Sequence, residues 1–192
     1  MVNYESHPIR HERYYSHDDY DRQSLHPRTR ERQLRRWDGL HSLEWIPFGK
    51  GHALPTRAVE YSTNAGAAIY IARARHAGSV TPGFFSINEK RCYIAWGGLA
   101  HKKLECEILC TPGEFVPCTT TNILLHGTPV GVSEFGEPLY IGRVKKETEL
   151  VYGKVQRSHQ VCYIPVDRKE KFDNDYEIFI KFPDNLTRAV TV

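Results

Sequence analysis

The same combination of an arginine and a later glutamate occurs twice in this sequence. Arg73 and Arg143 each close a short apolar alternation, and Glu107 and Glu177 follow them at matching positions. A guanidinium that is taken out of water must find a carboxylate, because an unpaired buried charge is strongly destabilising. We therefore expect internal ion pairs, Arg73 with Glu107 and Arg143 with Glu177. A second interpretation stays open, in which the arginines line a ligand pocket.

The sequence offers little for catalysis. It contains no nucleophile elbow, no HExxH motif, no phosphate-binding loop and no dinucleotide fingerprint. Half of the ten histidines fall at irregular spacing within residues 1–42. The five cysteines are an odd number without a CxxC pair, and Cys92 and Cys162 stand in a repeated CYI, so we expect reduced, buried thiols. The sequence predicts a protein that is not an enzyme and has no cofactor or metal site.

The region that carries these residues is a tandem repeat. A shift of seventy positions, without a gap, aligns EWIP (44–47) with EFVP (114–117) and CYI (92–94) with CYI (162–164). The same shift matches further residues of the two copies: Tyr70, Ile71, Arg73, Glu107 and Ile108 with Tyr140, Ile141, Arg143, Glu177 and Ile178. Self-similarity at a fixed period indicates two copies of one structural unit.

Each copy is expected to consist of β-strands. From Glu44 onward, short apolar alternations are broken by Gly, Pro, Asn and Asp, without a long amphipathic helix pattern. Alternation along one such run places Leu139, Ile141 and Arg143 on the same face. Two copies are too few for an open solenoid, so each repeat should complete the other's sheet. The predicted fold class is all-β, with two tandem pseudo-twofold-related repeats whose antiparallel sheets intertwine.

The sequence divides into four segments. We predict a polar tail over residues 1–42, a first repeat over 43–112, a second repeat over 113–184 and a C-terminal extension over 185–192. The tail holds eight arginines, seven acidic residues, five histidines and four tyrosines but few aliphatic side chains, so we expect it to be mostly disordered. Leu34, Trp37 and Leu40 could form one short helix that docks on the body. Contact of the tail with RNA or acidic lipid is an open alternative.

Charge and hydropathy limit the partners. The formal net charge is +3, from 26 basic and 23 acidic side chains, which gives no strong nucleic-acid signal. No apolar run is long enough for a transmembrane helix, and the N-terminus lacks the apolar segment of a secretion signal. We expect a protein that is cytoplasmic or is secreted without a conventional signal peptide.

Several phrases of the two copies resemble a known family. AIYIARARHAGSVTPG and CYIAWGG in the first copy, with GEPLYIGRV, YGK and HQVCYIP in the second, look like the tandem repeats of the DM-nine family, which is related to natterin-like lectin modules. The resemblance covers residues 45–182. It implies an all-β fold of two intertwined repeats and binding of mannose-type glycans in responses to microbes or parasites.

The resemblance also implies where a sugar would bind. The family's pattern has an acid just before the YIGR strand and a lysine after the glycine of a PGK turn. The second copy offers Ser133 and Glu134 at the first place and Lys154 at the second. The first copy departs from the pattern, with Thr63 and Asn64 near the acid position and Phe84 in place of the lysine.

A hexose needs acceptors, donors and an apolar wall, because its hydroxyls both donate and accept hydrogen bonds. Glu134, Lys154, Ser133 and His159 would supply the polar groups if their loops meet, and Tyr163 would supply the wall. Single sites of this kind bind weakly, so avidity through an oligomer such as a homodimer would matter. The other interpretation of Lys154 is a solvated turn lysine.

A second function class stays open. The repeats could form the platform of an intracellular scaffold or membrane-associating protein whose tail recruits partners. The tail's five histidines would gain charge between pH 7 and 5, so weak association with an anionic membrane would strengthen on acidification.

Overall fold

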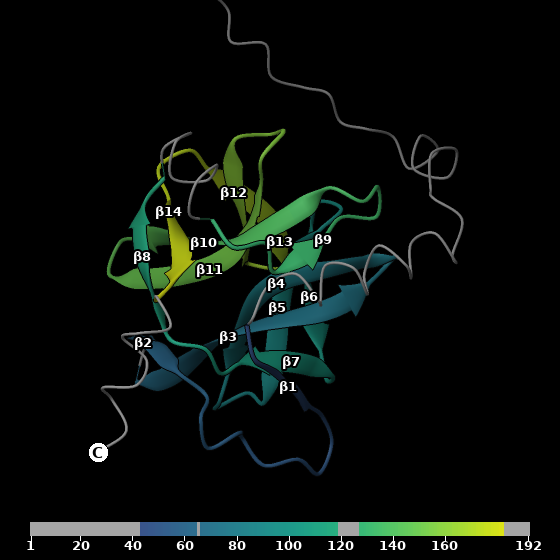
Figure 1. Cartoon of the computed structure of the whole chain (residues 1–192), viewed down its shortest axis with the longest axis vertical. Helices are drawn as coiled ribbons and strands as arrows, with labels where there is room; N and C mark the ends of the chain where they lie inside the picture. Colours follow the sequence, from purple (N-terminus) through teal and green to yellow (C-terminus); the bar gives the residue numbers. More distant parts are fainter. Residues whose placement is uncertain (1–42, 65, 119–126, 183–192) are drawn as a thin grey trace, which may run out of the picture.

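The computed structural model describes residues 43–64, 66–118 and 127–182 (Figure 1). The tail predicted over residues 1–42, its short helix and the C-terminal extension lie outside the described residues. Within these ranges the chain forms β-strands joined by turns, so the predicted all-β fold is confirmed. None of the described elements is a helix with the length and hydropathy of a membrane span.

The strands of the two repeats follow one another in the same order. The first set is β1 (Trp45–Phe48), β2 (Glu60–Asn64), β3 (Ala67–His76), β4 (Ser79–Ser86), β5 (Arg91–Trp96), β6 (Leu99–Lys103) and β7 (Cys106–Leu109). The second set is β8 (Gly113–Pro117), β9 (Gly131–Val132), β10 (Pro138–Lys146), β11 (Glu149–Gln156), β12 (Val161–Val166), β13 (Lys169–Asp173) and β14 (Glu177–Lys181).

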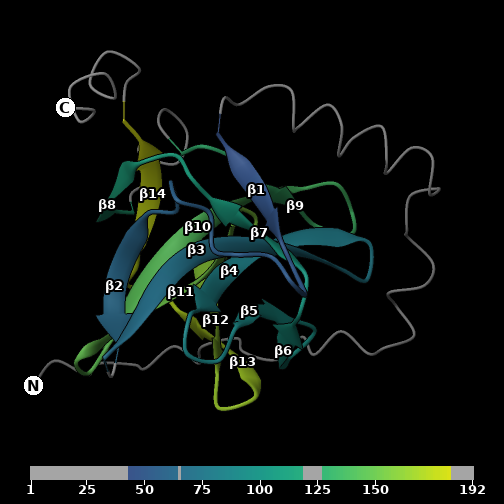
Figure 2. The same ribbon diagram turned by 90° about the horizontal axis from the view of Figure 1, so that it is seen from below.

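All strands belong to one antiparallel sheet that closes on itself. Its main path runs β1-β7-β3-β4-β5-β6-β13-β12-β11-β10-β14-β8, and β2 pairs with β3. The short strand β9 pairs with both β10 and β4, which joins the two halves a second time and closes a barrel. Figures 1 and 2 show the strands of the first half packed against those of the second. This is the predicted arrangement of intertwined repeats.

The junction of β6 with β13 marks the pseudo-twofold axis. Leu99 of the first repeat pairs with Lys169, the residue at the equivalent position of the second repeat. Two symmetric backbone hydrogen bonds flank this pair: Ala100 N donates to Arg168 O at 3.1 Å, and Glu170 N donates to Gly98 O at 3.0 Å. Residues near this axis therefore meet their partners across the repeat boundary.

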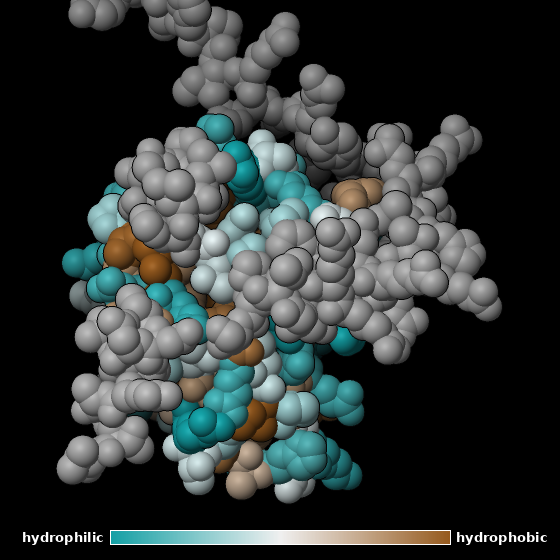
Figure 3. Space-filling model, viewed as in Figure 1, coloured by the Kyte–Doolittle hydropathy of each residue, from teal (hydrophilic) through white to brown (hydrophobic). Residues whose placement is uncertain are grey.

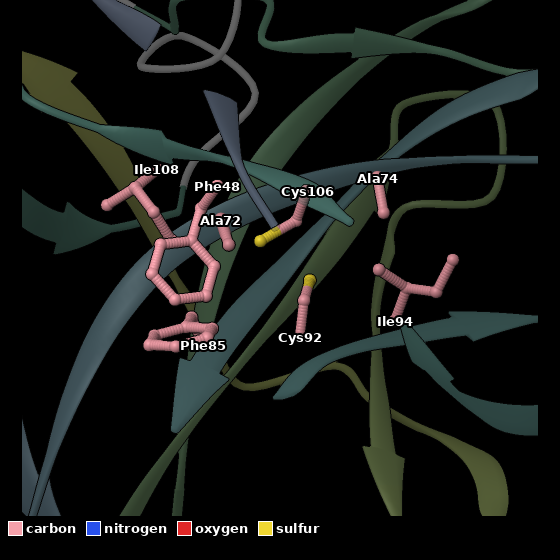
Figure 4. Packing of buried hydrophobic residues seen from close by; sticks show 8 residues of the cluster. All are labelled: Phe48, Ala72, Ala74, Phe85, Cys92, Ile94, Cys106 and Ile108. Carbon is pink, nitrogen blue, oxygen red and sulfur yellow. The ribbon is translucent and has the colours of Figure 1, made fainter. Parts of the chain in front are cut away.

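The core has three parts. One cluster belongs to each repeat, and Figure 4 shows that of the first, in which Phe48 packs on Phe85 and the Cys92 and Cys106 side chains point toward each other. The third cluster is shared, with Ile71 and Leu109 from the first repeat and Tyr152 from the second among its buried members. Each repeat thus covers an apolar face of the other. Removing this apolar surface from water stabilises the association of the two repeats.

Burial also follows the predicted alternation. Leu139 and Ile141 are buried, and Ile141 belongs to the shared cluster, whereas Tyr140 and Val144 pack in the cluster of the second repeat. On the face drawn in Figure 3, hydrophobic side chains show only in small separate areas among hydrophilic ones.

Candidate functional site

Both arginines expected to form ion pairs lie between a carboxylate and an aromatic ring. Arg73 Nε donates to Glu107 Oε2 at 2.8 Å, and its guanidinium lies 4.5 Å from the centre of the Trp45 ring. Arg143 Nε donates to Glu177 Oε2 at 2.6 Å. Its guanidinium stacks over Phe115 at 4.5 Å. This packing favours the structural interpretation over a ligand pocket, since the charged groups already have partners.

Lys154 is not a turn residue. It lies within β11, pairs with Ile141 and Tyr163 on the neighbouring strands and is 8% exposed, so the interpretation as a solvated turn lysine is wrong. The glycine that precedes it, Gly153, is required by close packing of strands and not by a turn. A Cβ there would collide with the carbonyl oxygen of Tyr163, and β11 and β12 approach closely because it is absent. Gly153 and Lys154 therefore lie inside a strand, where the glycine allows β11 and β12 to approach closely.

The Lys154 ammonium lies at the boundary of the two repeats. Its Nζ is 3.0 Å from Glu170 Oε1 and 5.2 Å from the centre of the Tyr163 ring. The Lys154 and Glu170 side chains are 10% and 11% exposed. Glu170 Oε2 accepts a hydrogen bond from the backbone N–H of Gly98, in the first repeat, at 2.7 Å. The first repeat thus helps to orient the Glu170 carboxylate.

The Glu170 carboxylate keeps acceptor capacity. Its Oε1 is buried and, among the described residues, receives no hydrogen bond of normal geometry, although the ammonium lies at ion-pair distance. A buried acceptor of this kind is unfavourable unless a further donor reaches it. An ammonium has three donors and no acceptor. Glu170 Oε1 therefore relies on the Lys154 ammonium as its counter-charge, and only the outer edges of the two charged groups face outward.

The other residues predicted for the site divide into two places. His159 Nδ1 and Tyr163 Oη form a hydrogen bond at 2.8 Å, which joins them to Lys154 through the tyrosine ring. Ser133 is instead used by the turn before β10, where its Oγ accepts hydrogen bonds from the N–H groups of Phe135 and Glu137 at 3.3 and 3.0 Å. Ser133 is also buried, and its hydroxyl holds this turn together through these hydrogen bonds.

Glu134 faces the first repeat. Its Oε2 accepts a hydrogen bond from Trp96 Nε1 at 3.3 Å. The Trp96 ring lies edge-on to His76, with ring centres 5.0 Å apart, and the His76 and His101 rings are 4.1 Å apart. The acid before the YIGR strand thus meets an aromatic cluster from the other copy.

His76 is held neutral in this cluster. Burial, together with Lys103, His101 and Lys154 nearby, lowers the pKa of His76 to about 4. A neutral ring can accept a hydrogen bond, and Lys103 Nζ lies 2.9 Å from its Nδ1.

The first-repeat counterparts differ. Phe84 replaces the lysine and stacks on Tyr93, with ring centres 5.1 Å apart and an interplanar angle of 15°. Thr63 and Asn64 end strand β2, where their backbones pair with Ala68 and Ala67. The described side chains also include no group of three or more His, Cys, Asp or Glu that could hold a metal ion.

Sequence reasoning missed Glu170, Trp96 and His76. Each of them differs from its counterpart seventy positions away: Glu170 from Ala100, Trp96 from Val166 and His76 from Lys146. Most aligned positions of the two copies also differ, so this divergence did not single them out.

Comparison with known proteins gives three results. The family model described as DM9 repeat matches residues 63–172. A search of curated proteins gave no match. Among solved structures, the fold is similar to that of the nematode sperm cell motility protein MFP2B, with a TM-score of 0.56 and 9% sequence identity. That alignment covers 73% of this chain and 44% of the nematode protein, so the chain spans less than half of its length and the likeness concerns the fold alone.

Proposed function

We propose that this chain, which belongs to the DM9 repeat family, binds mannose-type hexoses without transforming them. The family consists of β-rich, lectin-like binding modules. Preference for mannose, and a role in recognising the glycans of microbes or parasites, come from the family resemblance and are part of the proposal.

The observation that carries the proposal is the pair formed by Lys154 and Glu170. Two adjacent hydroxyls of a hexose can accept from the ammonium and donate to the exposed edge of the carboxylate. Charge-assisted hydrogen bonds of this kind are stronger than neutral ones. The Tyr163 ring, 5.2 Å from the ammonium, offers an apolar wall for the C–H face of a sugar.

The same geometry limits the affinity. Each side chain of the pair is about nine-tenths buried, so a sugar reaches only the outer edge of the charged groups. Water competes for each hydrogen bond at such an edge. We therefore expect weak binding of a single hexose and a stronger response to multivalent glycans.

The test is retention of the full chain on mannose-agarose, supported by a glycan array. Lys154→Met keeps the apolar stem and removes the ammonium, and it should lose retention. Lys171→Met is the matched control, because Lys171 also lies on a strand of this region but is exposed and paired with Asp167 at 2.7 Å. The control should be retained like the wild type.

Removing Lys154 alone leaves a buried carboxylate without its counter-charge, which could unfold the protein. The double variant Lys154→Met/Glu170→Gln avoids this, and circular dichroism verifies its fold. Binding by a folded double variant at the wild-type level would refute the site assignment. A wild type that no glycan retains would refute the proposed function.

A further inference from the structure

The first repeat does not have a lysine at the position of the family pattern, but another lysine lies near the equivalent tyrosine ring. Phe84 stands at the position of Lys154, yet Lys102 Nζ lies 5.1 Å from the centre of the Tyr93 ring. The corresponding distance from Lys154 to Tyr163 in the second repeat is 5.2 Å. Lys102 comes from β6, whereas Lys154 comes from β11, the equivalent of β4, so the two repeats place an ammonium beside equivalent tyrosines from opposite neighbouring strands.

A carboxylate completes the group in both repeats. Lys102 Nζ lies 3.1 Å from Glu89 Oε2, which also accepts a hydrogen bond from Tyr93 Oη. In the second repeat the carboxylate is that of Glu170, 3.0 Å from Lys154. The counterparts of Glu89 and Lys102 seventy positions on are His159 and Phe172, which cannot form the same ion pair.

The Tyr93 ring beside this ion pair is fixed in place. Phe84, the residue that replaced the lysine, stacks on Tyr93 at 5.1 Å. Phe84 on β4 and Lys102 on β6 therefore flank Tyr93 from its two neighbouring strands. The hydrogen bonds from Tyr93 and Lys102 hold the pKa of the Glu89 carboxyl below its usual range, so this group stays charged near neutral pH.

Exposure distinguishes this group from its counterpart. The Lys102 and Glu89 side chains are 60% and 52% exposed, whereas those of Lys154 and Glu170 are about one-tenth exposed. An exposed ion pair adds little to stability, because solvent screens it and its side chains lose entropy. Recurrence of one donor–acceptor–ring arrangement from non-equivalent positions points instead to a shared ligand chemistry.

We propose that Glu89, Tyr93 and Lys102 form a second site for the adjacent hydroxyls of a hexose, on the first repeat. The inference rests on the proposed function and extends it, since it makes the chain bivalent. The ammonium donates to one hydroxyl, the carboxylate accepts from its neighbour, and the exposed parts of the tyrosine carry the apolar side of the sugar. The tyrosines of the two sites, Tyr93 and Tyr163, occupy equivalent positions of the two repeats.

The experiment measures binding of the full chain to a mannan-coated surface and, by ligand-observed NMR, to methyl α-mannoside. Four proteins are compared with the wild type: Glu89→Gln/Lys102→Met, Lys154→Met/Glu170→Gln, the quadruple variant that combines them, and the control Lys171→Met. Losing one of two linked sites should weaken mannan binding by roughly 10²-fold while monovalent binding persists. The quadruple variant should bind neither probe, and the control should match the wild type.

The outcomes separate the two proposals. If Glu89→Gln/Lys102→Met binds mannan like the wild type while Lys154→Met/Glu170→Gln does not bind, the second site is wrong and the proposed function stands. If Glu89→Gln/Lys102→Met abolishes binding and the Lys154 variant has no effect, the exposed site stands and the buried assignment fails. A wild type that binds neither probe overturns both.

Discussion

Lys154 Nζ lies 3.0 Å from Glu170 Oε1, and the other oxygen of that carboxylate is held by the backbone N–H of Gly98 in the opposite repeat. The pair is nearly buried, and it forms beside the axis where Leu99 meets Lys169. A single repeat contains Lys154 and Glu170 but lacks the group that orients the carboxylate. The candidate site thus depends on both repeats.

Gly153→Ala should destabilise the protein strongly. A Cβ at this position would meet the carbonyl oxygen of Tyr163, which belongs to the backbone and cannot rotate away. We expect a loss of about 2–3 kcal/mol in the free energy of unfolding, as for overpacked cores. Urea denaturation measures it. Gly49→Ala is the control, since its Cβ would find only ordinary contact with a Glu105 side-chain carbon; equal stability of the two variants would show that the strands separate without cost.

Arg143→Met tests the structural role of the ion pairs. Glu177 would lose its partner in a setting where the Arg143 side chain is 21% and the Glu177 side chain 34% exposed. Because water partly screens this pair, we expect about 1–2 kcal/mol of destabilisation, between the values for surface and buried pairs. Thermal unfolding and mannose-agarose retention are measured together. Normal stability combined with lost binding would mean that the arginine contacts ligand.

His76 should make folding sensitive to mild acid. Its pKa is about 4 in the folded protein, against 6.5 for an ordinary histidine, so the unfolded chain takes up the proton first as the pH falls. His76 therefore lowers stability progressively from about pH 6.5 to about pH 4 and adds no further change below that. In His76→Gln, the fall of the melting temperature over this window should be shallower than in the wild type. His52→Gln, at an exposed position, should keep the wild-type slope; identical slopes in all three proteins would contradict the assignment.

Cys92 and Cys162 should resist alkylation in the native protein. Both are fully buried, and burial raises the pKa of the Cys162 thiol, which suppresses the reactive thiolate. Iodoacetamide labelling followed by peptide mass spectrometry should modify the half-buried Cys118 first and these two only after unfolding. Rapid native labelling of either would show that the strands open readily.

The fold was predictable because its signals are local and repeated. Alternation from Leu139 to Arg143 identified a strand with two distinct faces, and the structure places Ile141 and Tyr140 in different core clusters. The matching of the two copies indicated the pseudo-twofold relation, which Leu99 and Lys169 display directly. Residues 1–42 lie outside the described structure, and the recruitment role suggested for them stays a prediction.

The site was predictable only in part. Lys154, Tyr163 and His159 are joined by contacts within one repeat, whereas Glu134 turned out to accept from Trp96 of the other. Such partners depend on how the barrel closes, which local periodicity does not contain. The glycine before Lys154 suggested a turn because glycine favours turns, but here it permits the close approach of two strands.

A crystal of the full chain soaked with mannose tests the central claim most directly. We expect a hexose with one hydroxyl within hydrogen-bond distance of Lys154 Nζ and its neighbour within the same distance of the Glu170 carboxylate, against the Tyr163 ring. A sugar bound only at surfaces distant from both repeats' tyrosines, with the Lys154–Glu170 pair unchanged, would contradict the claim.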